Sequence, residues 1–371
     1  MKTQLIGIAI LAIIAGTPAI AADMEFKAPP PAPSGAFYAS IDGSYQSINL
    51  PTFDLGWRVF PSALFFGPGN AATSFDPRVS GAGTSGALGY ILPNGSLPTV
   101  FGSNVRVEIG GSYVHASGSQ FATATLATNG NVGFSLAFLN GAGASSTICP
   151  CIPFTSPLSA TLATSYTAWT VNGKVASDFR SGVFTATPSL AIFGGRATNN
   201  QSFDQQINSQ NFLGVFVELD DYRAQSNLAW TDVGVKGGLD LTADVTSWIA
   251  LGIGSTLGVT NREVSLSAND SFTISTFVPP LIGASAIAAS ASATPLLAGA
   301  NANVTVRPLP AVQVRGFVGL NYDSAVPGIA APQFVGATAG GFNPITTPAS
   351  IKFAHETSYY AGGGLSVRFG P

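Results

Sequence analysis

The last stretch of the chain alternates between two kinds of side chain. Counting back from the C-terminal end, every second residue is apolar or small: Phe369, Val367, Leu365, Gly363, Ala361 and Tyr359. The residues between them are mostly small or polar, and they include the charged Arg368. A period of two places the two sets on opposite faces of one β-strand, and about ten residues is the length of a tilted strand that crosses a bilayer. We therefore predict a membrane-spanning strand here, with an aromatic residue at each interface.

Similar alternation returns along the rest of the chain. We predict nine further strands, at residues 37–48, 81–92, 105–117, 164–177, 183–198, 224–242, 246–261, 294–307 and 312–323. The connections between them alternate between long and short, as in barrels with short periplasmic turns and long external loops. A membrane-spanning sheet needs to close so that no edge is left unpaired. The pattern therefore predicts an all-β, closed, antiparallel transmembrane barrel of about ten strands.

Two alternatives concern the region before the last three strands. A hairpin within residues 262–292, for instance at 264–276, would raise the count to about twelve strands. Residues 278–302 are apolar and uncharged, which suggests a transmembrane helix. However, Pro279, Pro280 and Pro295 interrupt them, and their many Ala and Ser residues have little affinity for lipid. We therefore favour strands in this region.

The composition excludes some classes of protein. Only 9% of the residues are charged and 46% are hydrophobic, whereas about a quarter of a typical soluble domain is charged. Such a chain does not have the surface of an ordinary hydrated domain. The net charge of -3 and the lack of a basic cluster argue against a nucleic-acid partner.

The N-terminus has the parts of a secretory signal. Lys2 supplies the positive charge, residues 5–16 form a short apolar core, and Ala19-Ile20-Ala21 is an A-x-A cleavage site. The apolar core is shorter than the roughly 20 residues of a membrane-spanning helix. We expect a signal peptide over residues 1–21, a Pro-rich periplasmic tail over 22–35 and the barrel over 36–371.

Both ends of the mature chain resemble those of a known family. The terminal aromatic residue and the alternate apolar residues behind it resemble the assembly signal of bacterial outer-membrane β-barrels, here Tyr359, Leu365, Val367 and Phe369. The mature start, from Ala22-Asp23-Met24 to Pro29-Pro30-Pro31, is similar to that of the small porin-like surface proteins of α-proteobacteria. The resemblance implies the outer membrane of a Gram-negative bacterium, contact with its lipid, and insertion by the barrel assembly machinery. It implies either a porin or a surface antigen, because the family includes both.

Charged residues occur on the strand faces that we predict to point into the lumen. They are Asp42, Arg106, Glu108, Lys174, Asp232, Lys236, Asp240, Arg315 and Arg368. One interpretation is a polar lumen whose charges of both signs give weak ion selectivity. The other is that the charges pair and fill the barrel. About ten strands lie nearer the eight that side chains fill than the sixteen to eighteen that leave an aqueous channel.

The other inward positions favour the first interpretation. They are mostly Ser, Thr, Gly and Asn, which leave room for water. We predict a narrow passive pore for small hydrophilic solutes or ions. The alternative is a structural or adhesive surface protein with a closed lumen, whose loops meet host or matrix partners. A homo-oligomer is compatible with both hypotheses.

Signals for catalysis and cofactors are weak. His115 and His355 lie near predicted external strand ends, and Asp220 and Asp221 lie in an external segment. A histidine near acids could activate water or a serine such as Ser117. However, His-Ala-Ser is not a specific motif, and we expect no enzyme. The sequence contains no metal-ligand cluster, phosphate-binding loop or dinucleotide fingerprint, so we expect no metal or cofactor.

Two cysteines, Cys149 and Cys151, flank a proline in a predicted loop. An exported chain meets an oxidising environment, but a bridge between residues two apart would be strained. A loop disulfide and a pair of thiols that are free or bridged to another molecule are both open. Two thiols are too few for a structural zinc site.

Overall fold

The computed structural model describes residues 35–60, 70–71, 73–93, 102–128, 133–147, 154–210, 216–274, 281–337 and 344–369. Residues 1–34, where we expect the signal peptide and most of the tail, lie outside this part of the chain, as do Cys149 and Cys151. No helix among the described residues is long and apolar enough to cross a membrane.

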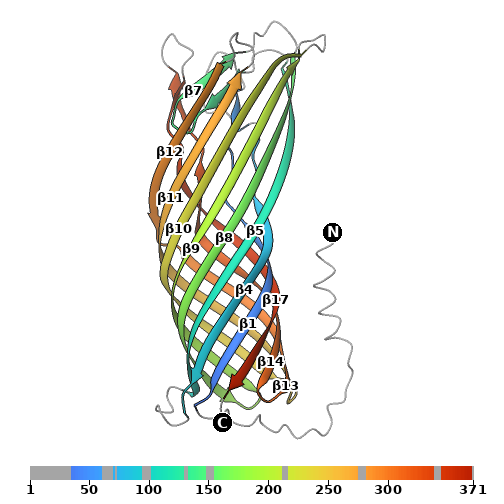
Figure 1. The fold of residues 1–371 in the computed structure, drawn as a ribbon, viewed down its shortest axis with the longest axis vertical. Helices are drawn as coiled ribbons and strands as arrows, with labels where there is room; N and C mark the ends of the chain where they lie inside the picture. The colour runs from blue at the N-terminus through green and yellow to red at the C-terminus, as the bar shows by residue number, and fades with distance from the viewer. Residues whose placement is uncertain are drawn as a thin grey trace. The chain divides into compact units, whose positions relative to one another are not determined.

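One antiparallel sheet of eleven strands forms the wall of the barrel (Figure 1). Its strands are β1 (Phe37–Asn49), β4 (Arg78–Ile91), β5 (Ser103–Thr128), β8 (Phe154–Ser181), β9 (Phe184–Gln210), β10 (Phe216–Asp244), β11 (Ile249–Ile274), β12 (Leu281–Ala293), β13 (Leu296–Leu309), β14 (Val312–Ala330) and β17 (Ser350–Phe369). They pair in the order β10-β9-β8-β5-β4-β1-β17-β14-β13-β11-β12, and β10 also pairs with β11, so the sheet returns on itself.

These eleven strands form a ring that is ten strands around, because two of them share one position. β12 and β13 lie end to end along β11, because Arg262–Ile274 pair with β12 and Ile249–Val259 pair with β13. Counting β12 and β13 as one place leaves ten. The predicted all-β antiparallel barrel of about ten strands is confirmed.

β1 and β17 join the two ends of the chain. Phe37 lies opposite Phe369, and the register continues to Ser47 opposite Tyr359. β17 pairs with β14 along its other edge. Both edges of the last strand are therefore hydrogen-bonded, which the interior of a bilayer requires.

We call the part of the ring at the level of β1 and β4 the membrane half. Its outward side chains are apolar and exposed, and include Phe37, Ile41, Leu88, Val107, Ile109, Val171, Leu190, Ile192, Val233, Val235, Ile253, Leu257, Leu365 and Phe369. The facing that alternation predicts for these strands is confirmed. The exposed apolar side chains form the lipid-contact band of a transmembrane barrel.

Five strands continue well beyond the membrane half. β5, β8, β9, β10 and β11 have 26, 28, 27, 29 and 26 residues, whereas β1 has 13 and β4 has 14. Residues 199–223 and 262–292, which we predicted as external loops, are mostly strand, so that prediction is wrong. The hairpin considered within 262–292 is present, because β11 ends at Ile274 and β12 begins at Leu281. The transmembrane helix considered for 278–302 is also wrong, because β12 and β13 occupy residues 281–293 and 296–309.

The apolar side of the wall changes as the strands leave the membrane half. On β10, Val233 and Val235 face outward, whereas Leu228 and Trp230 have the opposite parity and are buried inside. The pairing of β10 with β11 is continuous through this region, so no bulge reverses the strand. The sequence pattern itself inverts, because the surroundings change from lipid outside and a polar interior to water outside and an apolar protein core inside.

Two chain segments fill the inside of this upper part, which we call the extracellular half. They are residues 50–57 with 73–77, and residues 133–147, and together we call them the plug. They contribute to a small sheet of β2 (Trp57–Phe60), β3 (Asn70–Ala71), β6 (Gly133–Ala137) and β7 (Gly143–Thr147), in the order β3-β2-β6-β7. A further hairpin, β15 (Phe334–Ala337) and β16 (Pro344–Thr346), lies in the β14–β17 connection.

The plug and the wall share one apolar core. The buried plug residues are Phe53, Leu55, Trp57, Phe75, Leu136, Phe138 and Leu139. They pack against wall residues that include Leu158, Leu162, Phe203, Ile207, Tyr222, Leu228, Trp230, Leu266 and Phe272. Segments with few charges, which composition alone could not place, therefore both extend the strands and fold inward.

Above the membrane half, the wall is not continuous between the described residues of β12 and β14. The β13–β14 pairing reaches Leu297 opposite Asp323. Beyond it, the described part of β14 pairs with β17, and β12 pairs with β11. Arg262 lies at this fork, where its Nη1 donates to the carbonyl oxygen of Ala325 at 2.7 Å. The ring is thus continuous in the membrane half and splayed above it.

Candidate solute pathway

Two polar cavities lie inside the membrane half. The upper cavity has a volume of about 600 Å³ and the lower one about 410 Å³. Both are lined by Glu108, Lys174, Asp240, Asn301 and Arg315, so they adjoin at this level. The upper cavity extends to Trp230 and Arg262, and the lower one to Arg368.

The structure places every predicted lumen charge on one of these cavities. Asp232 and Lys236 line the upper cavity, whereas Asp42, Arg106 and Arg368 line the lower one. Glu108, Lys174, Asp240 and Arg315 line both. Residues two apart on a strand share a face, and the inward faces of all the strands line the same interior. Alternation on each strand therefore brings these side chains together.

Many of the inward charges form ion pairs across the strands. Their closest atoms are 2.8 Å apart for Asp42 and Arg315, 2.9 Å for Arg106 and Asp178, 3.0 Å for Glu108 and Lys174, and 2.8 Å for Asp232 and Arg262. Within the described residues, Lys236, Asp240 and Arg368 form no ion pair. Lys236 instead lies over the ring of Phe193, with Nζ 5.3 Å from the centroid. Charge pairing and water-accessible space therefore coexist.

The closing strand makes room for one of these pairs. Gly364 lies opposite both Asp42 and Arg315, on the strand between them. A Cβ at Gly364 would meet the carboxylate of Asp42. The Asp42–Arg315 pair can cross β17 because this position has no side chain.

Sequence reasoning missed several groups of the pathway. Tyr38 donates from its hydroxyl to Oε2 of Glu108 at 2.7 Å. Asp178 and Arg262 lie just beyond the predicted strands 164–177 and 246–261, and Asp323 is the last residue of the predicted strand 312–323, whereas the structure places them within β8, β11 and β14. Arg262 is an even-numbered residue of β11, and the even-numbered residues of this strand face inward. Extending the alternation beyond residue 261 would therefore have predicted an inward-facing Arg262.

The apolar core shared by the plug and the wall adjoins the upper cavity, since Ala197 and Trp230 belong to both. Polar contacts fix the plug to the wall. The backbone N–H of Trp57 donates to Oε1 of Gln205 at 2.8 Å, and that of Leu139 donates to Oδ2 of Asp270 at 2.9 Å. The hydroxyl of Tyr222 donates to the same Oδ2 at 3.1 Å. Burial and the neighbouring Asp270 carboxylate raise the pKa of Tyr222 well above its ordinary value, so this hydroxyl remains a donor.

The residues considered for catalysis are spread over the wall. His115 and Ser117 lie on the outer face of β5, where Nδ1 of His115 is 3.1 Å from Oγ1 of Thr167. His355 lies on β17, and β4 and β1 separate that strand from β5. Asp221 pairs with Arg223 on β10. No group of three or more His, Cys, Asp or Glu residues in the described part of the chain is arranged to hold a metal ion.

Comparison with known proteins yields structural likeness alone. No protein-family model matches the sequence, and no curated protein matches it. The outer membrane protease OmpT from Escherichia coli aligns with a TM-score of 0.37 and 10% identity, over 94% of this chain and 99% of that one. A Pseudomonas aeruginosa FadL homologue aligns with a TM-score of 0.21 and 6% identity, over 90% of each chain. An anion-selective porin from Comamonas acidovorans aligns with a TM-score of 0.19 and 9% identity, over 91% of this chain and 99% of that one.

TM-scores this low indicate neither activity nor ancestry, so localisation follows from the chain's own geometry. A ring of antiparallel strands with an apolar outer band and a polar interior is the architecture of an outer-membrane β-barrel. The chain has that ring, band and interior. It is an outer-membrane protein.

Proposed function

We propose that this protein is a plugged outer-membrane channel. Its membrane half provides a polar path for small hydrophilic solutes or ions. The plug shuts that path at the extracellular end, so conduction requires the plug to move. Barrels with water-filled interiors and barrels closed by their own loops are both established architectures.

The observation that carries this proposal is the pair of adjoining cavities. A barrel that serves only as an anchor needs no internal space, and small barrels are filled by side chains. Here two cavities of about 600 and 410 Å³ share five lining residues in the membrane half. The charges around them supply the local fields that select among ions.

The plug explains why the resting channel would be closed. Trp57, Leu136 and Leu139 are buried in a core that spans the interior between opposite parts of the wall. An apolar barrier of this kind opposes the passage of ions, because moving a charge out of water is costly. We therefore expect low conductance from the wild-type protein and higher conductance once the core is weakened.

A second candidate is a closed surface protein, as in the structural or adhesive alternative. The same plug favours it, because the extracellular half has an apolar core of its own, as a folded domain would. In this hypothesis the cavities are incidental and loosening the plug opens no path. Host or matrix partners would then contact the extracellular half.

Planar-bilayer recording separates the two candidates. We would compare the refolded mature chain with Trp57→Ala and Leu139→Ala, which truncate the plug, and with Leu251→Ala on the lipid-contact band as control. The channel proposal predicts rare steps from wild type and the control, and frequent steps from the plug variants. Silence from all four proteins, each shown to be folded and inserted, would leave the surface-protein candidate.

A further inference from the structure

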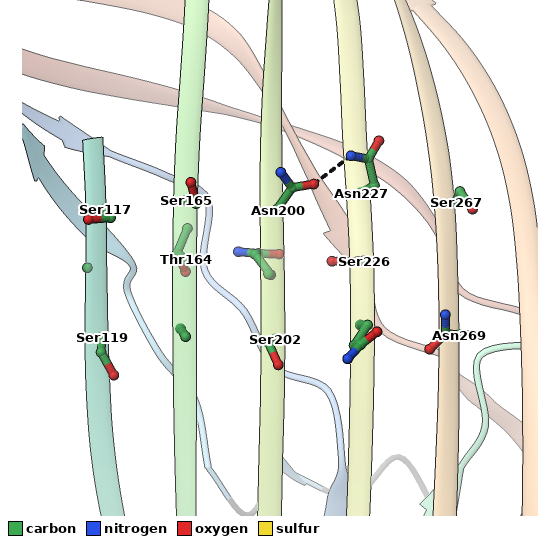
Figure 2. Close-up of a pocket in the computed structure, with 14 residues that line it drawn as sticks. Ser117, Ser119, Thr164, Ser165, Asn200, Ser202, Ser226, Asn227, Ser267 and Asn269 are labelled. Atoms are coloured by element: carbon green, nitrogen blue, oxygen red, sulfur yellow. Dashed lines mark hydrogen bonds between the residues drawn. The ribbon is translucent and has the colours of Figure 1, made fainter. Parts of the chain in front are cut away.

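The outer face of the extracellular half carries rows of uncharged polar side chains. One row crosses five neighbouring strands, β5, β8, β9, β10 and β11, and consists of Ser117, Ser165, Asn200, Asn227 and Ser267. The next row, which is farther from the membrane half, consists of Ser119, Ala163, Ser202, Gln225 and Asn269. Figure 2 shows the labelled members of both rows on adjacent strands. We call these two rows the polar face.

The polar face is hollowed and chemically available. The hollow has a volume of about 780 Å³. Nδ2 of Asn227 donates to Oδ1 of Asn200. Within the described part of the chain, the side chains of Ser165, Ser202 and Gln225 make no hydrogen bond. Small side chains create the space, and the hydroxyl and amide groups around it retain capacity for a ligand.

The chemistry of the polar face fits neutral sugars. Hydroxyl and amide groups can both donate and accept, which matches the hydroxyl groups of a saccharide. Phosphate recognition instead uses Arg or Lys, and neither row contains a charged residue. Charged side chains flank the face on both sides: Arg223 and Asp204 pair at 3.2 Å above it, and Arg196 and Glu263 lie on the outer surface two rows below it, level with Trp169.

The position of the polar face identifies the source of these sugars. Tyr113 and Trp169 lie opposite each other on β5 and β8, four residues below Ser117 and Ser165, and each is 47% exposed. Such aromatic residues mark the membrane interface, and the apolar lipid-contact band begins below them with Ile109 and Val171. Because two residues advance a strand by about 7 Å, the polar face lies at the level of the head groups of the outer leaflet.

We infer that the polar face binds the neutral sugars of glycolipids in the outer leaflet. The long strands β5 and β8 to β11 then present a lateral contact for the surrounding head groups, whereas β1 and β4 end at the level of the membrane half. The polar face faces away from the cavities and the plug. The inference therefore holds whether or not the barrel conducts.

The test uses the refolded mature chain in detergent micelles, with three probes. They are a lipopolysaccharide that carries neutral core sugars, the corresponding lipid A without them, and the free core oligosaccharide. The variant Asn200→Ala/Asn227→Ala removes two amides of the polar face. The control Gln206→Ala/Asn208→Ala removes two amides higher on the same outward face of β9, and circular dichroism checks that every variant is folded.

We expect the wild-type chain to bind the core-bearing lipid more tightly than lipid A. The Asn200→Ala/Asn227→Ala variant should weaken that binding about tenfold, since two hydrogen bonds are lost, and the control should not. The free oligosaccharide should bind more weakly than the anchored one, because the membrane anchor supplies effective concentration. Equal binding of both lipids, an equal loss in the control, or tight binding of the free oligosaccharide would each overturn the inference.

Discussion

Arg262 and Asp232 meet fork to fork between neighbouring strands, with Nε 2.8 Å from Oδ1 and Nη2 2.9 Å from Oδ2. Nη2 also lies 2.8 Å from Oδ2 of Asp323, and the side chain of Arg262 is only 3% exposed. The ring of Trp230 lies beside it, 5.7 Å from the guanidinium carbon. This cation therefore sits where the interior changes from polar to apolar and where β12 and β14 part.

Replacing Arg262 with Ala should lower the free energy of unfolding by about 3–5 kcal/mol, because it leaves two carboxylates without their partner in a mostly buried site. Arg223→Ala is the matched control. It breaks two ion pairs on the exposed outer face, where such pairs contribute about 0–1 kcal/mol each. Guanidinium titration of the refolded chains measures both changes. Similar losses in the two variants would show that Arg262 does not hold the fork.

Trp57 should be a main stabiliser of the plug. Its side chain is 1% exposed, and truncating a buried Trp to Ala costs about 3–5 kcal/mol. Trp248→Ala provides the contrast, because Trp248 lies in the β10–β11 turn and is 53% exposed, so the variant should lose far less stability. Unfolding followed by tryptophan fluorescence and by circular dichroism would detect the difference, and equal losses would contradict the packing described for the plug.

Gly364→Val should displace the Asp42–Arg315 pair, because a side chain at Gly364 would occupy the space of the Asp42 carboxylate. We expect a loss of about 1–3 kcal/mol from overpacking and altered ion selectivity in any channel that the barrel forms. Gly43→Val is the control, since a Cβ at Gly43 meets nothing within 4 Å. Reversal potentials under a salt gradient and denaturant midpoints report the two effects. If both variants behave as wild type, the gap at Gly364 has no role.

An Arg in place of Leu257 should cost about 2–4 kcal/mol, because Leu257 is exposed on the lipid-contact band and lies well inside β11, away from the β10–β11 turn. The same change at Ser189 should cost much less, since Ser189 lines the upper cavity. Refolding titrations into lipid vesicles give both values. Equal costs would mean that the inward and outward faces have been exchanged.

Asp221 should make the stability of the extracellular half depend on pH. Burial and then the carboxylate of Asp204 raise the pKa of Asp221, and Arg223 offsets only part of this. The folded chain then holds this proton more tightly than the unfolded chain. The contribution is therefore present below the unfolded pKa and is lost as the pH rises through the raised one. Asp221→Asn should flatten this part of the pH profile of the denaturant midpoint, whereas an unchanged slope would assign it to other groups.

Alternation predicted the membrane half well for a physical reason. Lipid outside and water inside impose opposite demands on adjacent residues, so Val233 and Val235 alternate with Asp232 and Lys236 in the sequence itself. The same demand predicted the inward charges that line the cavities. Their role as a solute path stays a prediction.

The extracellular half was harder to predict because its alternation is inverted. Leu228 and Trp230 face inward, so an assignment that places apolar residues outward ends each strand too early. The plug was beyond the sequence pattern, since Phe53, Trp57 and Leu139 are buried by contacts with residues far along the chain. The pairing of Arg262 with both Asp232 and Asp323 likewise depends on how three strands meet.

The register of the closing strands has a consequence for biogenesis. β1 and β17 pair from Phe37 with Phe369 to Ser47 with Tyr359, which lies entirely within the membrane half. None of the plug residues takes part in this seam. The membrane half of the barrel can therefore close along the β1–β17 seam before the plug folds into the extracellular half. Damage to the core of the plug would then leave a correctly inserted protein with an unfinished outer end.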